Sequence, residues 1–131
     1  MVTLSRRNRY DFIVGSAAEV SLGIATYSSI QTAIDQASTG DRILVLNGNF
    51  TEDIVINKEV AIIGQGASTT ITGTINLTID AARCLIKWLR FTGDLTVDAN
   101  SNWHFIRECW QANGSSITDN GTDNSILVIQ E

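Results

Sequence analysis

Ile86-Lys87-Trp88-Leu89 and Ile106-Arg107-Glu108-Cys109 are strand-like segments that align at an offset of 20 residues. Leu77, Val97 and Ile117, which lie in the segments between them, repeat at the same offset. A fixed period of this length is typical of stacked supersecondary units, none of which buries its apolar face alone. The sequence therefore predicts a solenoid, and the strand-like character of the repeated segments predicts that it is built of β-strands.

The composition fits one all-β domain. The chain has 131 residues, of which 44% are hydrophobic and 18% charged, and it contains no proline. Abundant Thr, Ile, Asn, Ser and Gly suit short strands joined by polar turns. The net charge of −5 argues against nucleic acid as a partner of the domain. No stretch reaches transmembrane length and no apolar signal segment opens the chain, so neither membrane insertion nor a signal peptide is expected.

The N-terminal segment differs from the rest in charge. Arg6, Arg7 and Arg9 form a compact basic cluster in a chain that is acidic overall. Two interpretations stay open. The cluster is either a solvated tail or an anchor onto an acidic protein partner or nucleic acid.

A helix is expected at residues 29–38, directly before the strand repeats. Ile30, Ala33, Ile34 and Ala37 follow helical spacing and make an apolar stripe, and Gly40 is a suitable C-terminal stop. Such a helix would cover the open end of a strand stack, where apolar interior and unpaired backbone otherwise meet water. We divide the chain into an arm with a short strand and helix, residues 1–26, and the repeat region, residues 27–131.

Period-two alternation in the strand segments separates interior from exterior side chains. The segment 74–79 places Ile75, Leu77 and Ile79 inside. The predicted interior residues are Ile43, Val45, Ile54, Ile56, Ile62, Leu77, Ile86, Leu95, Val97, Ile106 and Ile117.

Four segments, residues 27–35, 40–48, 50–52 and 60–66, together resemble the opening of pectin-lyase-like right-handed parallel β-helices. Gly40-Asp41, Phe50-Thr51-Glu52 and Ile63-Gly64-Gln65-Gly66 carry the likeness. The resemblance implies a right-handed, single-stranded parallel β-helix of about five coils with an N-terminal helical cap. It implies no reaction, because enzymes and purely structural members share these elements.

Residues 11–20 are similar to the lead-in of bacteriophage tail and virion β-helix proteins. This similarity implies a non-enzymatic structural or adhesive module of a phage-like virion, such as a tail spike, fibre or decoration protein. A homo-oligomer, most simply a trimer, would be expected, with other virion proteins and a surface polysaccharide as further possible partners. The location would be the virion, or the cytoplasm during assembly. The alternative is a small carbohydrate-active enzyme, pectate-lyase-like or a glycosidase, or a fragment of one.

The acidic residues do not match the needs of that alternative. Pectate lyases require acids for calcium and a base, and β-helix glycosidases require two carboxylates at a defined separation. Asp94 and Asp98 flank one strand, but the equivalent positions in neighbouring repeats hold no acid. We interpret both as solvated turn residues, and we expect no catalytic residue, metal or cofactor.

The strongest candidate binding residues lie in the two segments that define the 20-residue repeat. With Ile86 and Leu89 inside, the outward side chains are Lys87, Trp88, Arg90, Arg107 and Trp110. Trp and Arg dominate binding hot spots, so a subunit interface is the first hypothesis. A carbohydrate-stacking platform is the second. The third is that the chain's own loops cover the Trp side chains.

Other polar and sulfur-bearing residues have structural interpretations. Cys84 and Cys109 have apolar neighbours and are expected to be buried free thiols. Asp80, Asn100 and Asn120 recur at intervals of 20, which predicts a ladder of hydrogen-bonded side chains.

Overall fold

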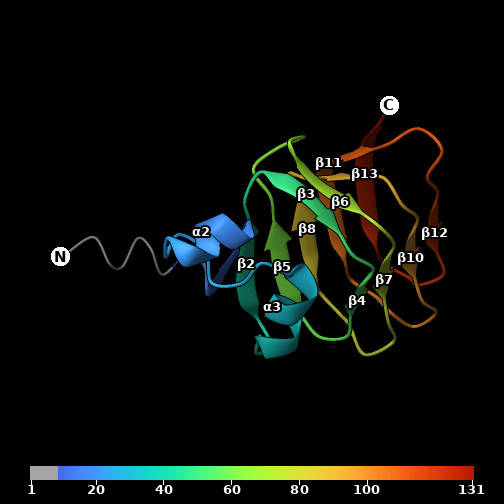
Figure 1. Ribbon diagram of the computed structural model, residues 1–131. Coiled ribbons are helices and arrows are strands. Elements are labelled where there is room, and N and C mark those ends of the chain that lie inside the picture. Colours follow the sequence, from blue (N-terminus) through green and yellow to red (C-terminus); the bar gives the residue numbers. More distant parts are fainter. Residues whose placement is uncertain (1–8) are drawn as a thin grey trace.

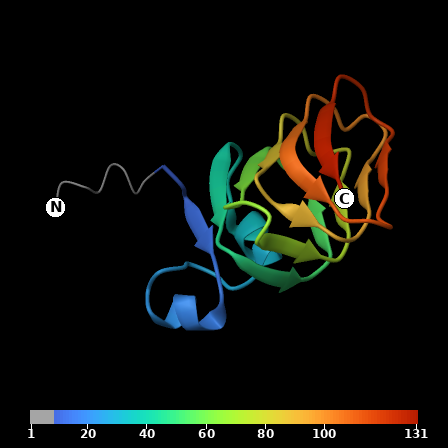
Figure 2. The same ribbon diagram turned by 90° about the horizontal axis from the view of Figure 1, so that it is seen from above.

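The chain folds as a parallel β-solenoid, described here from a computed structural model that covers residues 9–131. Strands stack in about four turns (Figure 1). Strand β1 lies at one end of the stack and strand β13 at the other, and Figure 2 shows the short helix α2 set beside the stack. Arg6 and Arg7 of the basic cluster lie outside the described residues.

Two parallel sheets form the coils. A nine-stranded sheet wraps two sides and a four-stranded sheet forms the third side. The larger sheet contains β1 (Phe12–Val14), β2 (Asp41–Val45), β3 (Gly48–Thr51), β5 (Val60–Ile63), β6 (Thr69–Thr72), β8 (Leu85–Lys87), β9 (Arg90–Phe91), β11 (Phe105–Gln111) and β13 (Ser125–Gln130). The smaller sheet contains β4 (Ile54–Ile56), β7 (Ile75–Leu77), β10 (Leu95–Val97) and β12 (Ile117–Asp119).

The predicted register is confirmed. Ile86 pairs with Ile106 between β8 and β11, and Leu77 pairs with Val97 between β7 and β10. The expected five coils become about four turns, because β13 begins a further coil without completing it among the described residues.

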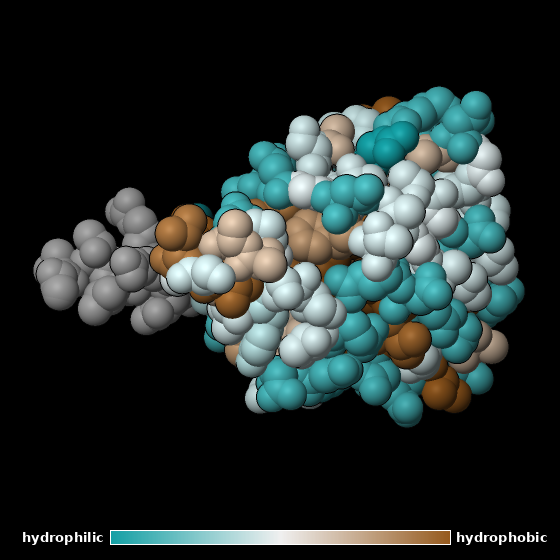
Figure 3. All heavy atoms as spheres, in the orientation of Figure 1, coloured by the Kyte–Doolittle hydropathy of each residue, from teal (hydrophilic) through white to brown (hydrophobic). Residues whose placement is uncertain are grey.

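The interior of the stack is apolar, as alternation predicted. Ten of the eleven predicted interior residues are buried, and Ile117 near the C-terminal end is half-buried. Ile79 was wrongly placed inside: β7 ends at Leu77, alternation stops there, and Ile79 is 59% exposed. On the face shown in Figure 3, exposed apolar residues form separate patches among hydrophilic ones.

Helix α3 (Ile30–Gln36) covers the N-terminal end of the stack. Ile30, Ala33 and Ile34 are fully buried and pack into the core. The helix is shorter than the predicted 29–38 because Ser29 is the N-cap and Ala37 already has extended backbone. Before it, α2 (Ala17–Ser21) begins with a complete capping box made by Ser16 and Glu19.

Hydrogen bonds join α3 to the first coil near both ends of the helix. The Glu52 carboxylate accepts hydrogen bonds from the Ser29 hydroxyl and from the backbone N–H groups of Ile30 and Gln31, at 2.9, 2.7 and 3.1 Å. The Gln31 side-chain amide donates to the carbonyl of Val55 and accepts from its N–H. These bonds occupy backbone groups of β4, the edge strand of the smaller sheet. At the other helix end, the Lys58 ammonium donates to the carbonyl of Ala37 at 2.9 Å.

The C-terminal end has no comparable cover among residues 9–131. Strand β13 pairs on one side with β11 and has no strand on its other side there. Leu127 and Ile129 are 62% and 54% exposed. Ile126 and Val128 point toward the interior yet remain only half-buried, because no further coil lies above them in the described part of the chain. Within that same part, no helix is long and apolar enough to span a membrane.

Candidate binding surface

Trp88 and Glu108 occupy equivalent corners of successive coils. Both have left-handed backbone, with φ of 60° and 54°. At Glu108 the pairing of β11 with β13 shifts by one residue, as it does in a β-bulge. This conformation is costly for residues other than glycine, and it turns both side chains outward at the corner. It also explains how inward Ile86 and Leu89 can be separated by two outward residues.

The Trp88 side chain is held in place but not covered. Its indole Nε1 donates a hydrogen bond to the Glu108 carboxylate at 3.1 Å. The Lys87 ammonium lies 4.0 Å from the centre of the Trp88 ring, within cation–π distance. The residue remains 40% exposed, so part of the ring is free to contact a partner.

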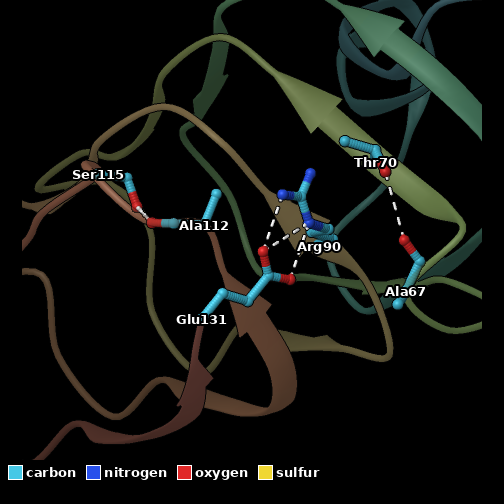
Figure 4. Close-up of polar contacts among 6 residues, drawn as sticks. All are labelled: Ala67, Thr70, Arg90, Ala112, Ser115 and Glu131. Carbon is cyan, nitrogen blue, oxygen red and sulfur yellow. Dashed lines mark hydrogen bonds and ion pairs between the residues drawn. The ribbon is translucent and has the colours of Figure 1, made fainter.

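Arg90 is engaged by the last residue of the chain. Its guanidinium forms a two-pronged ion pair with the Glu131 carboxylate, with nitrogen–oxygen distances of 2.8 and 2.9 Å (Figure 4). This hydrogen bonding lowers the pKa of Glu131 and raises that of Arg90. Trp110 lies beside Arg90 in register on the next coil and is half-buried. Arg90 therefore joins this surface to the C-terminal end of the stack.

Arg107 is exposed on β11. Its guanidinium carbon lies 5.2 Å from the centre of the Phe105 ring, and Nη2 donates to the Ser125 hydroxyl at 2.6 Å. Phe105 is itself 53% exposed. Leu127 continues the same outward row on β13, next to Arg107. These two apolar residues were not predicted, although period-two alternation from Ile106 would have placed Phe105 outside.

Lys87, Trp88, Arg90, Arg107 and Trp110 thus lie on neighbouring coils around one corner, and we call them the corner patch. Lys87 and Arg107 are register partners on one side of the corner, and Arg90 and Trp110 on the other. Trp103 is separate: it occupies the corner before β11 and is 54% exposed. The corner patch combines planar aromatic surface with cations and leads directly to the uncovered end.

A buried polar network inside the stack was not predicted. His104 is fully buried; its Nδ1 accepts from the Cys84 backbone N–H at 3.1 Å and its Nε2 lies 2.8 Å from the Ser101 hydroxyl. Since an N–H occupies Nδ1, the ring proton must sit on Nε2 and point to Ser101, whose hydroxyl donates to the Ala81 carbonyl. Burial lowers the pKa of His104, and the charge of Asp119 offsets part of that effect. The network holds neighbouring coils together.

The ladder predicted at Asp80, Asn100 and Asn120 is wrong: no hydrogen bond joins their side chains, and all three are exposed. Polar stacking occurs a few residues later, where Asn102 accepts from the Thr122 N–H at 2.7 Å and Asn124 accepts from the His104 N–H at 2.8 Å. Side chains here bond to backbone of the adjacent coil rather than to each other.

Asp94 and Asp98 also bond between coils. Asp94 accepts from the Ser116 N–H at 2.9 Å, and Asp98 accepts from the Asn76 amide at 3.4 Å. Cys84 and Cys109 are buried free thiols, as predicted. Burial raises the pKa of each to about 11, so both are protonated at neutral pH.

A shallow hollow of about 130 Å³ lies beside the uncovered end. Gln111, Ser115, Gln130 and Glu131 contribute to its lining. Residues 112–115 form a turn that lines part of it, and Figure 4 shows the Ser115 hydroxyl donating to the Ala112 carbonyl there, at 2.9 Å. The Thr70 hydroxyl donates to the Ala67 carbonyl in the same way on another coil. Residues 9–131 contain no group of three or more His, Cys, Asp or Glu that could hold a metal ion.

Comparison with known proteins finds no relative of this chain. No family model matches the chain, and no curated protein and no solved structure is significantly similar to it.

Proposed function

We propose that this protein is a non-enzymatic structural or adhesive module that assembles with further copies of itself, most simply as a trimer. The observation that carries the proposal is the exposed apolar surface of β11 and β13, where Phe105, Leu127 and Ile129 are 53%, 62% and 54% exposed. Helix α3 packs over the first coil against β1, β2 and β4, whereas the last coil exposes Leu127, Ile129 and a strand edge among the described residues. Exposed strand edges invite pairing with another chain, and native proteins usually protect them.

The corner patch supports the same proposal. Trp88 and Trp110 lie with Arg90 and Arg107 on adjacent coils, and these residue types are enriched at the centres of protein interfaces. Phe105 and Leu127 extend the apolar area along β11 and β13. The patch and the uncovered end are contiguous, so one partner surface could cover both.

The setting we propose is a phage-like virion, as part of a tail spike, fibre or decoration protein. Support comes from the similarity of residues 11–20 to the lead-in of such proteins and from a solenoid fold suited to rigid, elongated assemblies. The other proteins of the particle would then be further partners.

Glycan binding is the second candidate, and the exposed ring of Trp88 favours it. Sugars stack on flat aromatic faces, and the Lys87 ammonium beside that ring could hold an acidic polysaccharide. An adhesive module could combine this role with assembly. A carbohydrate-active enzyme rests on the family resemblance alone.

Light scattering on the parent chain and on the double variant Trp88→Ala/Trp110→Ala tests the proposal. We expect the molar mass to fall toward the monomer value of 14.2 kDa with an unchanged strand signal in circular dichroism. Trp103→Ala is the matched control, because it removes an exposed Trp from a different corner. A monomeric parent whose double variant loses binding to a glycan array would replace the assembly role with the glycan role.

A further inference from the structure

Strand β13 is an acceptor for an added strand. Its sequence, Ser125-Ile126-Leu127-Val128-Ile129-Gln130, contains no charge, proline or glycine, and three of its six residues are β-branched aliphatics. Such an edge readily pairs with another extended segment. The inward Ile126 and Val128 stay half-buried, so an added strand would also need apolar side chains at alternate positions.

Acidic residues stand next to this edge, although Arg107 also contacts it by donating to the Ser125 hydroxyl. Residues 108–131 contain Glu108, Asp119, Asp123 and Glu131 but no Lys or Arg. Asp123 and Glu131 flank β13 at its two ends. The Glu131 carboxylate is paired with Arg90, whereas Asp123 is exposed and takes part in no ion pair among residues 9–131. A partner that complements Asp123 would be basic next to its strand-forming portion.

One segment of the chain itself has both properties. Residues 1–9 contain Arg6, Arg7 and Arg9 and no acid. Before the arginines, Val2 and Leu4 alternate with polar Thr3 and Ser5, as the missing strand requires. Glu131 is already paired with Arg90, so Asp123 is the acid at the end of β13 that is left for these arginines.

The segment is too short to pair along the whole of this edge within its own molecule. From β1 to β13 the sheet makes five steps through β2, β5, β8 and β11. At about 4.8 Å per strand, a strand added beyond β13 would lie about 29 Å from β1. The residues before β1, even fully extended, span at most about 40 Å, so no more than about three of them would be left to pair along β13. An occupant of the whole edge must come from a second copy.

We propose that residues 1–9 of one copy bind along β13 of the next copy and cover its C-terminal end. In this contact Val2 lies opposite Val128 and Leu4 opposite Ile126, so the segment runs antiparallel to β13 and the arginines pair with Asp123. The contact joins two different surfaces, and a heterologous contact is what a cyclic trimer needs. This inference rests on the proposed function, because it takes the self-association of the chain as given. It adds that residues 1–9 make the contact.

A charge-swap experiment tests this contact. The triple variant Arg6→Glu/Arg7→Glu/Arg9→Glu and the single variant Asp123→Lys each place like charges at the contact. We expect light scattering to show each of them shifted toward 14.2 kDa, and a variant that carries all four changes in one chain to recover the parent mass. Recovery follows because the acidic segment of each copy of the combined variant then faces the introduced lysine of the next copy at every contact of the ring. Asp80→Lys, the same charge change at an exposed residue of another coil, should keep the parent mass.

The outcomes separate this inference from the proposed function. If the charge variants keep the parent mass, or the variant that combines all four changes stays monomeric, the inference is overturned. If only Trp88→Ala/Trp110→Ala then lowers the molar mass in solution, the proposed function still holds. If the unmodified chain is monomeric, both fail. Raising the salt concentration should weaken the parent assembly, because the contact is partly between exposed charges.

Discussion

His104 shows what a single residue contributes to this solenoid. Both ring nitrogens bond to different parts of the chain, and the accepting Nδ1 faces a backbone N–H that cannot change role. Protonation of Nδ1 would set two N–H groups against each other inside the stack. The neutral ring is therefore part of the native packing, and the charged ring is incompatible with it.

This geometry predicts a pH-dependent stability. In the unfolded chain His104 has its ordinary pKa of 6.5, whereas burial lowers the pKa in the folded chain. Below pH about 6.5 the unfolded state therefore binds more protons, and the free energy of unfolding falls until the lower folded pKa is reached. Urea unfolding between pH 8 and 5 should show this fall in the parent. His104→Gln does not titrate there, so an equal slope in both proteins would contradict the prediction.

Single residues also set the limit of prediction from sequence. Alternation identified the buried residues well because it depends only on neighbours in the same strand. Trp88 and Glu108 adopt a left-handed backbone conformation although neither is glycine, and neither residue type predicts that conformation. The His104 network likewise joins Cys84, Ser101 and His104 through contacts between coils, which local patterns do not record.

At the scale of elements, α3 depends on the first coil as much as on its own sequence. A seven-residue helix is marginal in isolation, so its tertiary contacts decide whether it forms. Glu52 supplies most of the N-terminal ones, since its carboxylate accepts three hydrogen bonds from Ser29, Ile30 and Gln31.

Replacing Glu52 by Ala should therefore weaken the N-terminal cap. We expect a loss of about 1–3 kcal/mol, the usual effect of leaving part-buried donors without their charged acceptor. Chemical denaturation measures the loss, and the neighbouring exposed residue provides the control Thr51→Ala. An equal free energy of unfolding for the two variants would show that Glu52 does not stabilise α3.

The corners impose a second constraint on the elements. A Cβ at Gly93 would collide with the carbonyl oxygen of Gly73 on the preceding coil, and a Cβ at Gly73 would collide with that of Glu52. Successive coils approach so closely there that backbone meets backbone. Gly93→Ala should cost about 2–3 kcal/mol, as overpacking does.

Gly23→Ala is the matched comparison for Gly93→Ala. Gly23 has a φ of +77° but open space around it, so only backbone strain of about 1 kcal/mol is expected. Thermal unfolding of both variants measures the difference. If Gly23→Ala is the more damaging change, coil spacing at this corner is not limited by the glycines.

At the scale of the whole molecule, the two ends of the stack are unlike. The sequence predicted α3 and its position, because an amphipathic stripe and a glycine stop are local signals. The 20-residue repeat likewise predicted the solenoid. Neither signal revealed how Phe105, Leu127 and Ile129 would combine with the corner patch, since these residues come together only through the stacking of β11 and β13.

The most direct test of the account is the molar mass of the unmodified chain in solution, measured by light scattering over a range of concentrations. The proposed trimer, which would bury the corner patch, predicts a species of about three times the monomer mass of 14.2 kDa. A mass of 14.2 kDa at every concentration would contradict it.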